Sequence, residues 1–284
     1  MRQKKRSWQC SGGKRGLVPV ATFRNIAIGQ YIPGESMLHR LDPRTKIAVT
    51  LLLVVGLFFI DSYLGYGLAA LYIALAVLNS GIPARFLFRG LKPVIIIILL
   101  TFALNSFLTE GEIIWQWGFL SLTKEGLYKG GLLAVRLILL IVGTSILTLT
   151  TSPLALTDGL ESLLRPGRRV GIPAHELAMM MTIALRFIPT LLEETEKIMK
   201  AQMARGADFE SGNLLQRAKS LLPLLVPLFV SAFRRADELA IAMEARCYRG
   251  GEGRTKLKQL AFRPADFFVL AGSGVFIVWL ALVA

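Results

Sequence analysis

Val94-Ile95-Ile96-Ile97-Ile98-Leu99-Leu100 is an unbroken run of aliphatic residues inside an apolar segment that extends from Leu91 to Leu108. A helix needs about 20 mostly apolar residues to cross a lipid bilayer, and four further segments have this character. They run from about Thr45 to Ile60, from about Tyr63 to Leu78, from Gly126 to about Thr150, and from about Asp266 to Val283. The sequence therefore predicts an all-α membrane protein with about five transmembrane helices.

The composition of the 284-residue chain supports this class. Hydrophobic residues make up 54% of the chain, charged residues only 18%, and the mean hydropathy is +0.55. A soluble globular domain carries roughly 25% charged residues, and a disordered chain needs low hydrophobicity, so both classes are excluded. The charge is unbalanced, with 33 Lys and Arg against 19 Asp and Glu. Basic cytoplasmic parts of a membrane protein explain both facts, whereas nucleic-acid binding explains only the charge.

The distribution of Lys and Arg predicts the orientation, because cytoplasmic loops of membrane proteins are enriched in these residues. Residues 1–46 contain ten of them, 80–92 three and 151–264 seventeen, whereas the predicted outer stretches 61–65 and 109–125 together contain one. We therefore expect a cytoplasmic N-terminus and an external C-terminus. The first twenty residues lack an apolar core, so no cleavable signal peptide is expected. The two cysteines of the chain are too few for a disulfide framework, which is consistent with a reducing cytosol.

Four regions follow from this topology. Residues 1–23 form a basic tail that we expect to be disordered; it either binds anionic lipid or is a flexible extension, such as an expression-vector remnant. Residues 24–150 form a membrane domain of four spans, the first two joined by a tight hairpin across Asp61-Ser62. Residues 151–264 form a cytoplasmic helical domain, and residues 265–284 form a C-terminal transmembrane helix.

The cytoplasmic region 151–264 is helical rather than a loop. Two long amphipathic helices are predicted, from Ala174 to about Ala204 and from Leu214 to about Cys247, because their apolar residues recur at helical spacing on one side. Such helices must pack on each other, on the membrane spans or on a partner. An acidic run in the first helix either lies on a solvated face or pairs with Arg234 and Arg235 of the second.

A short sequence repeat lies at the ends of these two helices. Ala201-Gln202-Met203-Ala204-Arg205-Gly206 recurs as Ala242-Met243-Glu244-Ala245-Arg246-Cys247, about 41 residues later. Small residues on both sides of the arginine would let a partner backbone approach closely, and the guanidinium suits carboxylates. Two such tips imply a partner dimer or two similar partners. The alternative is that both arginines are helix-end cations that interact with the last backbone carbonyls.

The sequence resembles a known family over roughly residues 24 to 284: the transmembrane coupling subunit, or T component (EcfT/CbiQ-like), of energy-coupling-factor transporters. These are vitamin and metal-ion importers of the ABC class. The resemblance lies in the two arginine tips and in four motifs: Gly29-Gln30-Tyr31-Ile32-Pro33-Gly34, Leu41-Asp42-Pro43-Arg44-Thr45-Lys46, Leu149-Thr150-Thr151-Ser152-Pro153 and Leu185-Arg186-Phe187-Ile188-Pro189. Cys247 departs mildly from the family, in which the second tip ends in Gly or another small residue.

The resemblance implies that the two long helices are coupling helices in a bacterial plasma membrane protein. Their tips would dock on a pair of cytosolic ABC-type ATPases through Ala204, Arg205, Gly206, Ala245, Arg246 and Cys247. The remaining surface would hold a small substrate-binding membrane subunit (S component). ATP would be bound by the partners, so the chain itself would need no cofactor. In agreement, the chain has no phosphate-binding loop, because Gly12-Gly13-Lys14-Arg15 lacks the required spacing, and we expect no enzyme activity from it.

Several polar residues of the predicted spans have expected roles. Asp42 and Pro43 suit the N-cap and first position of the first span, and Asp42, Pro43, Arg44 and Lys46 are predicted to anchor it at the inner membrane surface. Arg136 is the only charge deep in a span, which makes it a functional or architectural candidate. It would pair with Asn105 or with backbone carbonyls, or face a partner subunit.

Two other classes of function remain open. The first is a membrane-embedded enzyme that acts on an anionic substrate at the inner leaflet, with Asp158, Glu161, His175 and Glu176 as candidate groups. These residues match no catalytic spacing, and His175-Glu176 is no zinc motif because position 179 is Met; no metal site is expected. The second is a self-sufficient transporter or channel, which would need inverted repeats with broken spans; the sequence shows no such repeat.

Overall fold

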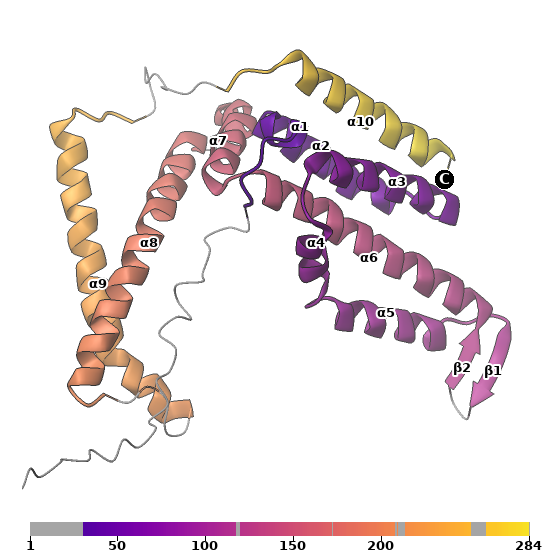
Figure 1. The fold of residues 1–284 in the computed structure, drawn as a ribbon, viewed down its shortest axis with the longest axis horizontal. Helices are drawn as coiled ribbons and strands as arrows, with labels where there is room; N and C mark the ends of the chain where they lie inside the picture. Colours follow the sequence, from indigo (N-terminus) through magenta and orange to yellow (C-terminus); the bar gives the residue numbers. More distant parts are fainter. Residues whose placement is uncertain are drawn as a thin grey trace, which may run out of the picture. The chain divides into compact units, whose positions relative to one another are not determined.

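A computed structural model describes residues 31–117, 120–171, 173–207, 209, 214–250 and 260–283 (Figure 1). The basic tail 1–23 lies outside the described residues. The described chain forms two compact units: one is Ile188–Ala245, and the other combines Gly29–Phe187 with Arg246–Ala284. The four predicted regions are defined by the two sides of a membrane and stay a prediction. The boundary between the two compact units lies elsewhere, between Phe187 and Ile188 inside one long helix.

Four helices form the main bundle of the larger unit: α2 (Pro43–Phe58), α3 (Tyr63–Ser80), α6 (Lys124–Thr150) and α10 (Pro264–Val283) (Figure 1). Helices α2 and α10 are parallel, and α3 and α6 run in the opposite direction. We call the end where α2 and α10 begin the Asp42 end, and the opposite end the Asp61 end. The bundle core is apolar and consists of Leu53, Leu57, Ile60, Tyr66, Ala69, Ile73, Leu132, Leu139 and Leu280.

The predicted third span is wrong at its start. The segment forms α4 (Ala84–Leu91) and α5 (Ile95–Leu108), two helices that meet at an angle of 57°. Pro93 lies at the break, where its ring and missing N–H prevent a continuous helix. Helix α5 then packs along α6, where Gly126 and Gly130 bring the two backbones together: a Cβ on Gly126 would lie 2.6 Å from the carbonyl oxygen of Asn105. Small residues four apart are a common basis of close helix packing in membranes.

The segment between α5 and α6 forms a β-hairpin that the sequence analysis did not predict. Strands β1 (Ile113–Trp117) and β2 (Leu120–Thr123) are antiparallel, with Gln116 opposite Ser121 and a bulge near the start of β1. The hairpin lies at the Asp61 end, where Thr123 then caps α6 by accepting a hydrogen bond from the backbone N–H of Gly126 (3.1 Å).

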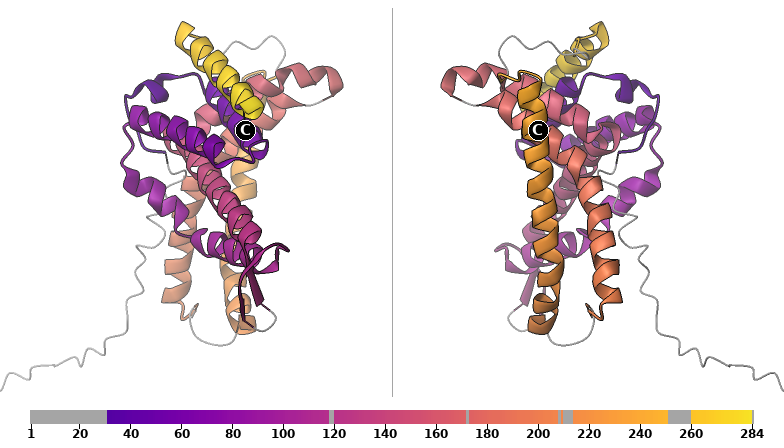
Figure 2. Two further views of the ribbon diagram at one scale, coloured as in Figure 1. Left: turned by 90° about the vertical axis from the view of Figure 1, so that its right-hand side faces the viewer. Right: turned by 90° about the vertical axis from the view of Figure 1, so that its left-hand side faces the viewer.

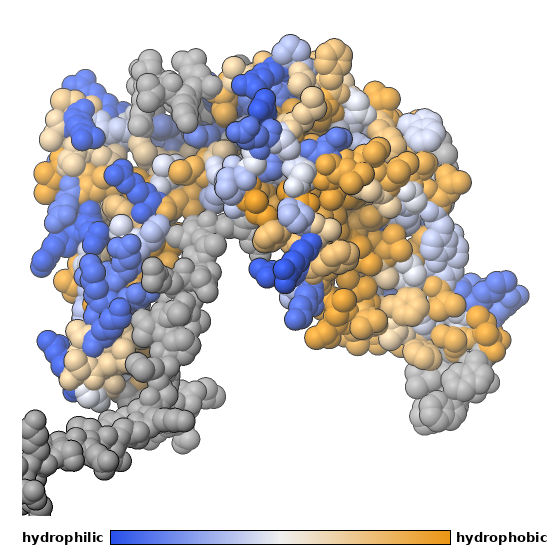
Figure 3. All heavy atoms as spheres, in the orientation of Figure 1, coloured by the Kyte–Doolittle hydropathy of each residue, from blue (hydrophilic) through white to orange (hydrophobic). Residues whose placement is uncertain are grey.

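The remaining described helices are α1 (Met37–Arg40), α7 (Pro153–Leu164), α8 (Ala174–Ala204) and α9 (Leu214–Ala245), with a 3-10 turn at Arg165–Val170. Helix α7 packs on α2 within the larger unit. The two long helices were predicted to within about two residues, and each continues through its internal prolines. Figure 3 shows hydrophobic residues over α5 and α6, whereas hydrophilic residues gather over α8 and α9.

Helices occupy all five predicted spans, but not all of them are long enough to cross a bilayer by themselves. Among the described residues, three helices have the required length and hydropathy: α3, α6 and α8, or four if α4 and α5 count as one bent span. Helix α2 has 16 residues, and α10 is a shorter apolar helix over its described part. Helix α8 was predicted to be cytoplasmic, and it is the least apolar of the three. The protein is an all-α membrane protein.

Candidate functional site

The first arginine tip is a Schellman motif that ends α8. Gly206 adopts φ +89°, its N–H donates to the carbonyl of Met203 (3.0 Å), and the N–H of Ala207 donates to the carbonyl of Gln202 (2.9 Å). Because backbone N–H groups occupy these helix-end carbonyls, the guanidinium of Arg205 is not needed there. Its side chain is exposed and makes no hydrogen bond or ion pair with any described residue. This geometry favours docking over the helix-end interpretation.

The second tip also has a residue of positive φ at its third position, although this residue is not a glycine. Cys247 is the only described non-glycine residue with positive φ, at +54°, and it follows Ala245 and Arg246 as Gly206 follows Ala204 and Arg205. All three residues of this tip are exposed. The small residue at the third position therefore has a local reason, the left-handed turn that ends the helix, in addition to the close approach of a partner that the sequence suggested.

The pair Gly206 and Cys247 gives a testable consequence of this turn. A side chain in the left-handed region costs roughly 1–2 kcal/mol, so Cys247→Gly is expected to stabilise the end of α9 by about 0.5–1 kcal/mol, after allowing for the greater flexibility of glycine in the unfolded chain. Gly206→Ala should weaken the end of α8 by about 1 kcal/mol. Amide hydrogen exchange at each helix end measures both; equal protection in variant and wild type would contradict the proposed strain.

The two tips lie at opposite ends of an antiparallel helix pair (Figures 1 and 2). Gln202 donates to the carbonyl of Pro223 (3.3 Å), and Arg235 pairs with Glu194 at 3.4 Å. Of the two interpretations left open for the acidic run, pairing with the second helix is found at one residue, Glu194, with Arg235. Ala245 lies 22 residues beyond Pro223, roughly 33 Å along the helix at 1.5 Å per residue, whereas Ala204 lies beside Gln202. One small partner surface therefore does not cover both tips.

Three of the four family motifs, those that contain Ile32, Lys46 and Leu149, lie together at the Asp42 end of the bundle. The N–H of Ile32 donates to the carbonyl of Leu149 (3.0 Å), and the ring of His39 lies 3.1 Å from the carbonyl of Ile32. The ammonium of Lys46 donates to the carbonyls of Thr150 (3.1 Å) and His39 (3.3 Å). Segments more than one hundred residues apart are joined in this way, so these motifs build the helix connections at this end.

The start of α2 is tied to the start of α10 by buried carboxylates. Asp42 caps α2 by accepting from the N–H of Arg44 (2.9 Å), and its own N–H donates to Asp266 (2.8 Å). The other carboxylate oxygen of Asp266 accepts from the N–H of Arg263 (2.8 Å). Asp42, Lys46 and Asp266 are only 6%, 8% and 1% exposed. The cap at Asp42-Pro43 is confirmed; a membrane-surface role of these residues stays a prediction, and the buried side chains act within the protein.

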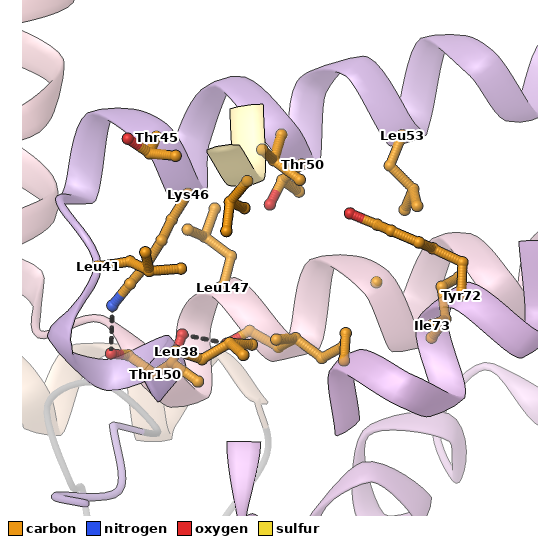
Figure 4. Close-up of a pocket in the computed structure, with 15 residues that line it drawn as sticks. Leu38, Leu41, Thr45, Lys46, Thr50, Leu53, Tyr72, Ile73, Leu147 and Thr150 are labelled. Carbon is orange, nitrogen blue, oxygen red and sulfur yellow. Dashed lines mark hydrogen bonds between the residues drawn. The ribbon is translucent and has the colours of Figure 1, made fainter. Parts of the chain in front are cut away.

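A mainly apolar cavity of about 140 Å³ lies beside this cluster, between α2, α3, α6 and α10 (Figure 4). Lys46 lies at its Asp42 end, and the hydroxyl of Tyr72, which bonds to Ser273 (2.7 Å), lies at the other. The walls between them are aliphatic side chains such as Leu53 and Leu147. Lys46 and Tyr72 are engaged with the protein, whereas the buried hydroxyl of Thr45 in the cavity wall has no hydrogen-bond partner among the described residues.

Arg136 joins α6 to the hairpin between α2 and α3. Its Nε donates to the hydroxyl of Tyr66 (2.5 Å), and an Nη donates to the carbonyl of Ile60 (2.8 Å) and lies 3.4 Å from Asp61. The guanidinium also lies over the ring of Phe58, 5.5 Å from its centroid. Of the partners considered from sequence, backbone carbonyls are the ones found; Asn105 instead donates to Thr101 of its own helix (2.9 Å).

We expect Arg136→Gln to lower the free energy of unfolding by about 2 kcal/mol, because a carbonyl at the end of α2 and the Tyr66 hydroxyl lose a charged donor. Tyr66→Phe should cost less, and the double variant should cost less than the sum, with a coupling of about 1 kcal/mol. Unfolding in mixed micelles measures all three variants. Additive effects would show that the Arg136–Tyr66 contact does not stabilise the bundle.

The residues considered for an enzyme site form a structural pair instead of a catalytic cluster. His175 Nδ1 lies 3.0 Å from Glu161, which links the start of α8 to α7. Within the described ranges, no three His, Cys, Asp or Glu side chains are grouped closely enough to hold a metal ion.

A sequence profile of the cobalt transport protein family, CbiQ, matches residues 34–257, which is most of the chain. The chain belongs to this family. Three relatives are each called energy-coupling factor transporter transmembrane protein EcfT. The relative from Thermosediminibacter oceani is 64% identical over 90% of this chain and 97% of its own length, and that from Ruminiclostridium cellulolyticum is 56% identical over 92% and 97%. The relative from Bacillus subtilis is 52% identical over 87% and 93%. The chain is thus an EcfT/CbiQ-like T component, a multi-pass transporter subunit of the plasma membrane.

Three residues that position the motifs of this CbiQ/EcfT chain were not found from sequence. Asp266 was treated only as the start of a span, and no role was assigned to His39 or Tyr66. Two of them have distant partners: Asp42 lies 224 residues before Asp266, and Arg136 lies 70 residues after Tyr66. The one local signal was a lone carboxylate at the start of an apolar segment, which indicates a buried or interfacial partner.

Proposed function

We propose that this T component couples ATP hydrolysis by two cytosolic ABC-type ATPases to the reorientation of a separate substrate-binding membrane subunit, for uptake of a vitamin or metal ion. The observation that carries this proposal is the pair of exposed arginines, Arg205 and Arg246, which form no ion pair with a described residue and each precede a residue of positive φ at the end of a long helix. The names of the relatives support the transporter class. The tips Ala204-Arg205-Gly206 and Ala245-Arg246-Cys247 would each receive one ATPase.

The helix pair provides a physical path for such coupling. Helices α8 and α9 are joined by two contacts, Gln202 with Pro223 and Arg235 with Glu194. A movement of the two ATPases against the two tips would be transmitted along α8 and α9. The chain itself would be non-catalytic, and ATP would be held by the partners.

The orientation of the chain is part of this proposal. The described chain enters the bundle at the Asp42 end, where Ile32 bonds to Leu149, and α10 ends at the Asp61 end, where Leu280 lies in the core. The two ends of the described chain are therefore on opposite ends of the bundle. Together with the distribution of Lys and Arg, this supports a cytoplasmic N-terminus and an external C-terminus.

The test is purification of the tagged chain from membranes of its host, followed by mass spectrometry of the bound subunits and an ATPase assay. We expect two ATPase chains and a small membrane subunit, with ATP turnover in the complex and none by the chain stripped of its partners. Turnover of a phospholipid by the stripped chain would support the enzyme alternative. Substrate flux through the chain alone in liposomes would support the self-sufficient transporter.

A further inference from the structure

Helix α4 carries a row of cations that the proposed coupling function does not use. Arg85, Arg89 and Lys92 are spaced at i, i+4 and i+7, so they lie on one face of the helix, about 6 Å apart at their Cβ atoms. All three are exposed, and none forms an ion pair with a described residue. The sequence contains no Asp or Glu from Ser62 to Thr109, so no local carboxylate neutralises the row.

The opposite face of α4 is attached to the bundle. Leu87 is 7% exposed and packs with Ile82 and Leu149, and Gly90 lies close to α6, where a Cβ would be 3.4 Å from the hydroxyl of Ser145. The row of cations therefore points away from the protein. In Figure 3 a hydrophilic patch lies over α4 and borders the hydrophobic surface of α5.

Two aromatic side chains flank the row. Phe86 is 39% exposed and Phe88 is 68% exposed, and at 100° per residue they lie on either side of the face that carries Arg85 and Arg89. Helix α4 is bent by 57° from α5, at the Asp42 end of the bundle, where α3 ends and α5 begins. A short helix that turns out of the direction of the spans, with cations between two exposed rings, is suited to the membrane interface.

We propose that α4 is a binding site for the phosphate of an anionic phospholipid in the leaflet at the Asp42 end. The guanidinium groups of Arg85 and Arg89 bind phosphate oxygens, for which their planar donors are suited, and Lys92 adds a third charge. Phe86 and Phe88 lie among the upper acyl chains. Free inorganic phosphate would gain nothing from the two rings, whereas the acyl chains of a lipid would pack against them, so lipid is the occupant that we argue for. The site is independent of whether ATPases dock on α8 and α9.

The test is native mass spectrometry of the full chain, purified in detergent with an equimolar mixture of phosphatidylglycerol and phosphatidylcholine. Wild type is expected to retain phosphatidylglycerol preferentially. The variant Arg85→Gln/Arg89→Gln/Lys92→Gln should reduce this preference roughly tenfold, since phosphate contacts by two or three cations are lost. The matched control is Lys129→Gln/Lys219→Gln/Arg234→Gln, which removes three exposed cations elsewhere and should leave the preference unchanged.

Two further measurements separate the possible results. Thermal unfolding of the triple variant should match that of wild type in phosphatidylcholine alone, and only wild type should gain stability when phosphatidylglycerol is added. Inorganic phosphate at the same concentration should produce no such gain. Equal retention of phosphatidylglycerol by the triple variant and wild type would overturn the proposal, and so would an equal gain of stability from inorganic phosphate, which would indicate a general anion site.

Discussion

The double variant Arg205→Glu/Arg246→Glu is expected to lose its ATPase partners on purification from membranes, while the chain itself stays inserted and folded. Both side chains are exposed and form no ion pair with a described residue, so substitution affects the fold by only a few tenths of a kcal/mol, with up to about 1 kcal/mol more from a carboxylate near a helix C-terminus. An arginine at the centre of an interface typically contributes about 2–4 kcal/mol, which corresponds to roughly 30- to 700-fold in affinity at each tip.

The single variants sharpen this experiment. The two tips lie at opposite ends of the α8–α9 pair, so Arg205→Glu leaves the second tip available and Arg246→Glu leaves the first. If the two ATPases form a dimer, the remaining contact retains it through the effective concentration of the second site. We therefore expect each single variant to keep most of its ATPase at low salt and to lose it at high salt, and the double variant to lose it under both conditions.

The matched control for charge reversal is Arg234→Glu. Arg234 is exposed in the body of α9 and next to Arg235, so the substitution makes the same change of charge away from both tips. It should leave co-purification intact. Retention of the ATPases by the double variant would contradict the proposed docking, and the search would then move to the sides of α8 and α9. Equal loss in the Arg234 variant would indicate a general electrostatic attraction instead of two docking points.

The helices were predictable because the chain marks them with local signals. Apolar segments of suitable length, Asp42-Pro43 at one start and the turn residues Asp61-Ser62 between two spans place α2 and α3 within a few residues. The break before α5 also had a local signal in Pro93, but the long apolar run obscured it. The β-hairpin was missed because its strands are short, and a count of apolar residues over a window of about 20 does not detect a period of two.

The residues of the candidate site also divide into those that the sequence predicted and those that it did not. The two arginine tips are local features of the sequence, and their positions near the ends of two long helices were predicted; in each tip the third residue, Gly206 or Cys247, has a positive φ. The pairing of Arg136 with a carbonyl was one of several open alternatives. The contact of Asp42 with Asp266 was not predictable, because a hydrogen bond between residues 224 positions apart depends on how α2 and α10 pack and leaves no periodic pattern.

Asp266→Ala is expected to have the largest effect on stability. The carboxylate is 1% exposed, accepts from the backbone N–H groups of Asp42 and Arg263, and is one of the two carboxylates whose charge acts on the buried Lys46. Its removal leaves the buried N–H of Asp42 and the part-buried N–H of Arg263 without their acceptor and weakens the compensation of a buried cation. Removing one partner of a buried charge arrangement costs about 3–5 kcal/mol.

Such a loss corresponds to a decrease in Tm of roughly 6–20 °C for a domain of this size, measurable by thermal unfolding of the chain in detergent. Asp266→Asn keeps one oxygen acceptor but removes the charge, so it should fall between wild type and Asp266→Ala. Glu238→Ala, which removes an exposed carboxylate from α9, is the control and should leave Tm within about 2 °C of wild type. If Asp266→Ala unfolded at the wild-type temperature, the contact between the starts of α2 and α10 would not hold the bundle together. The helices would then depend on their apolar faces and on the Arg136 contacts at the other end.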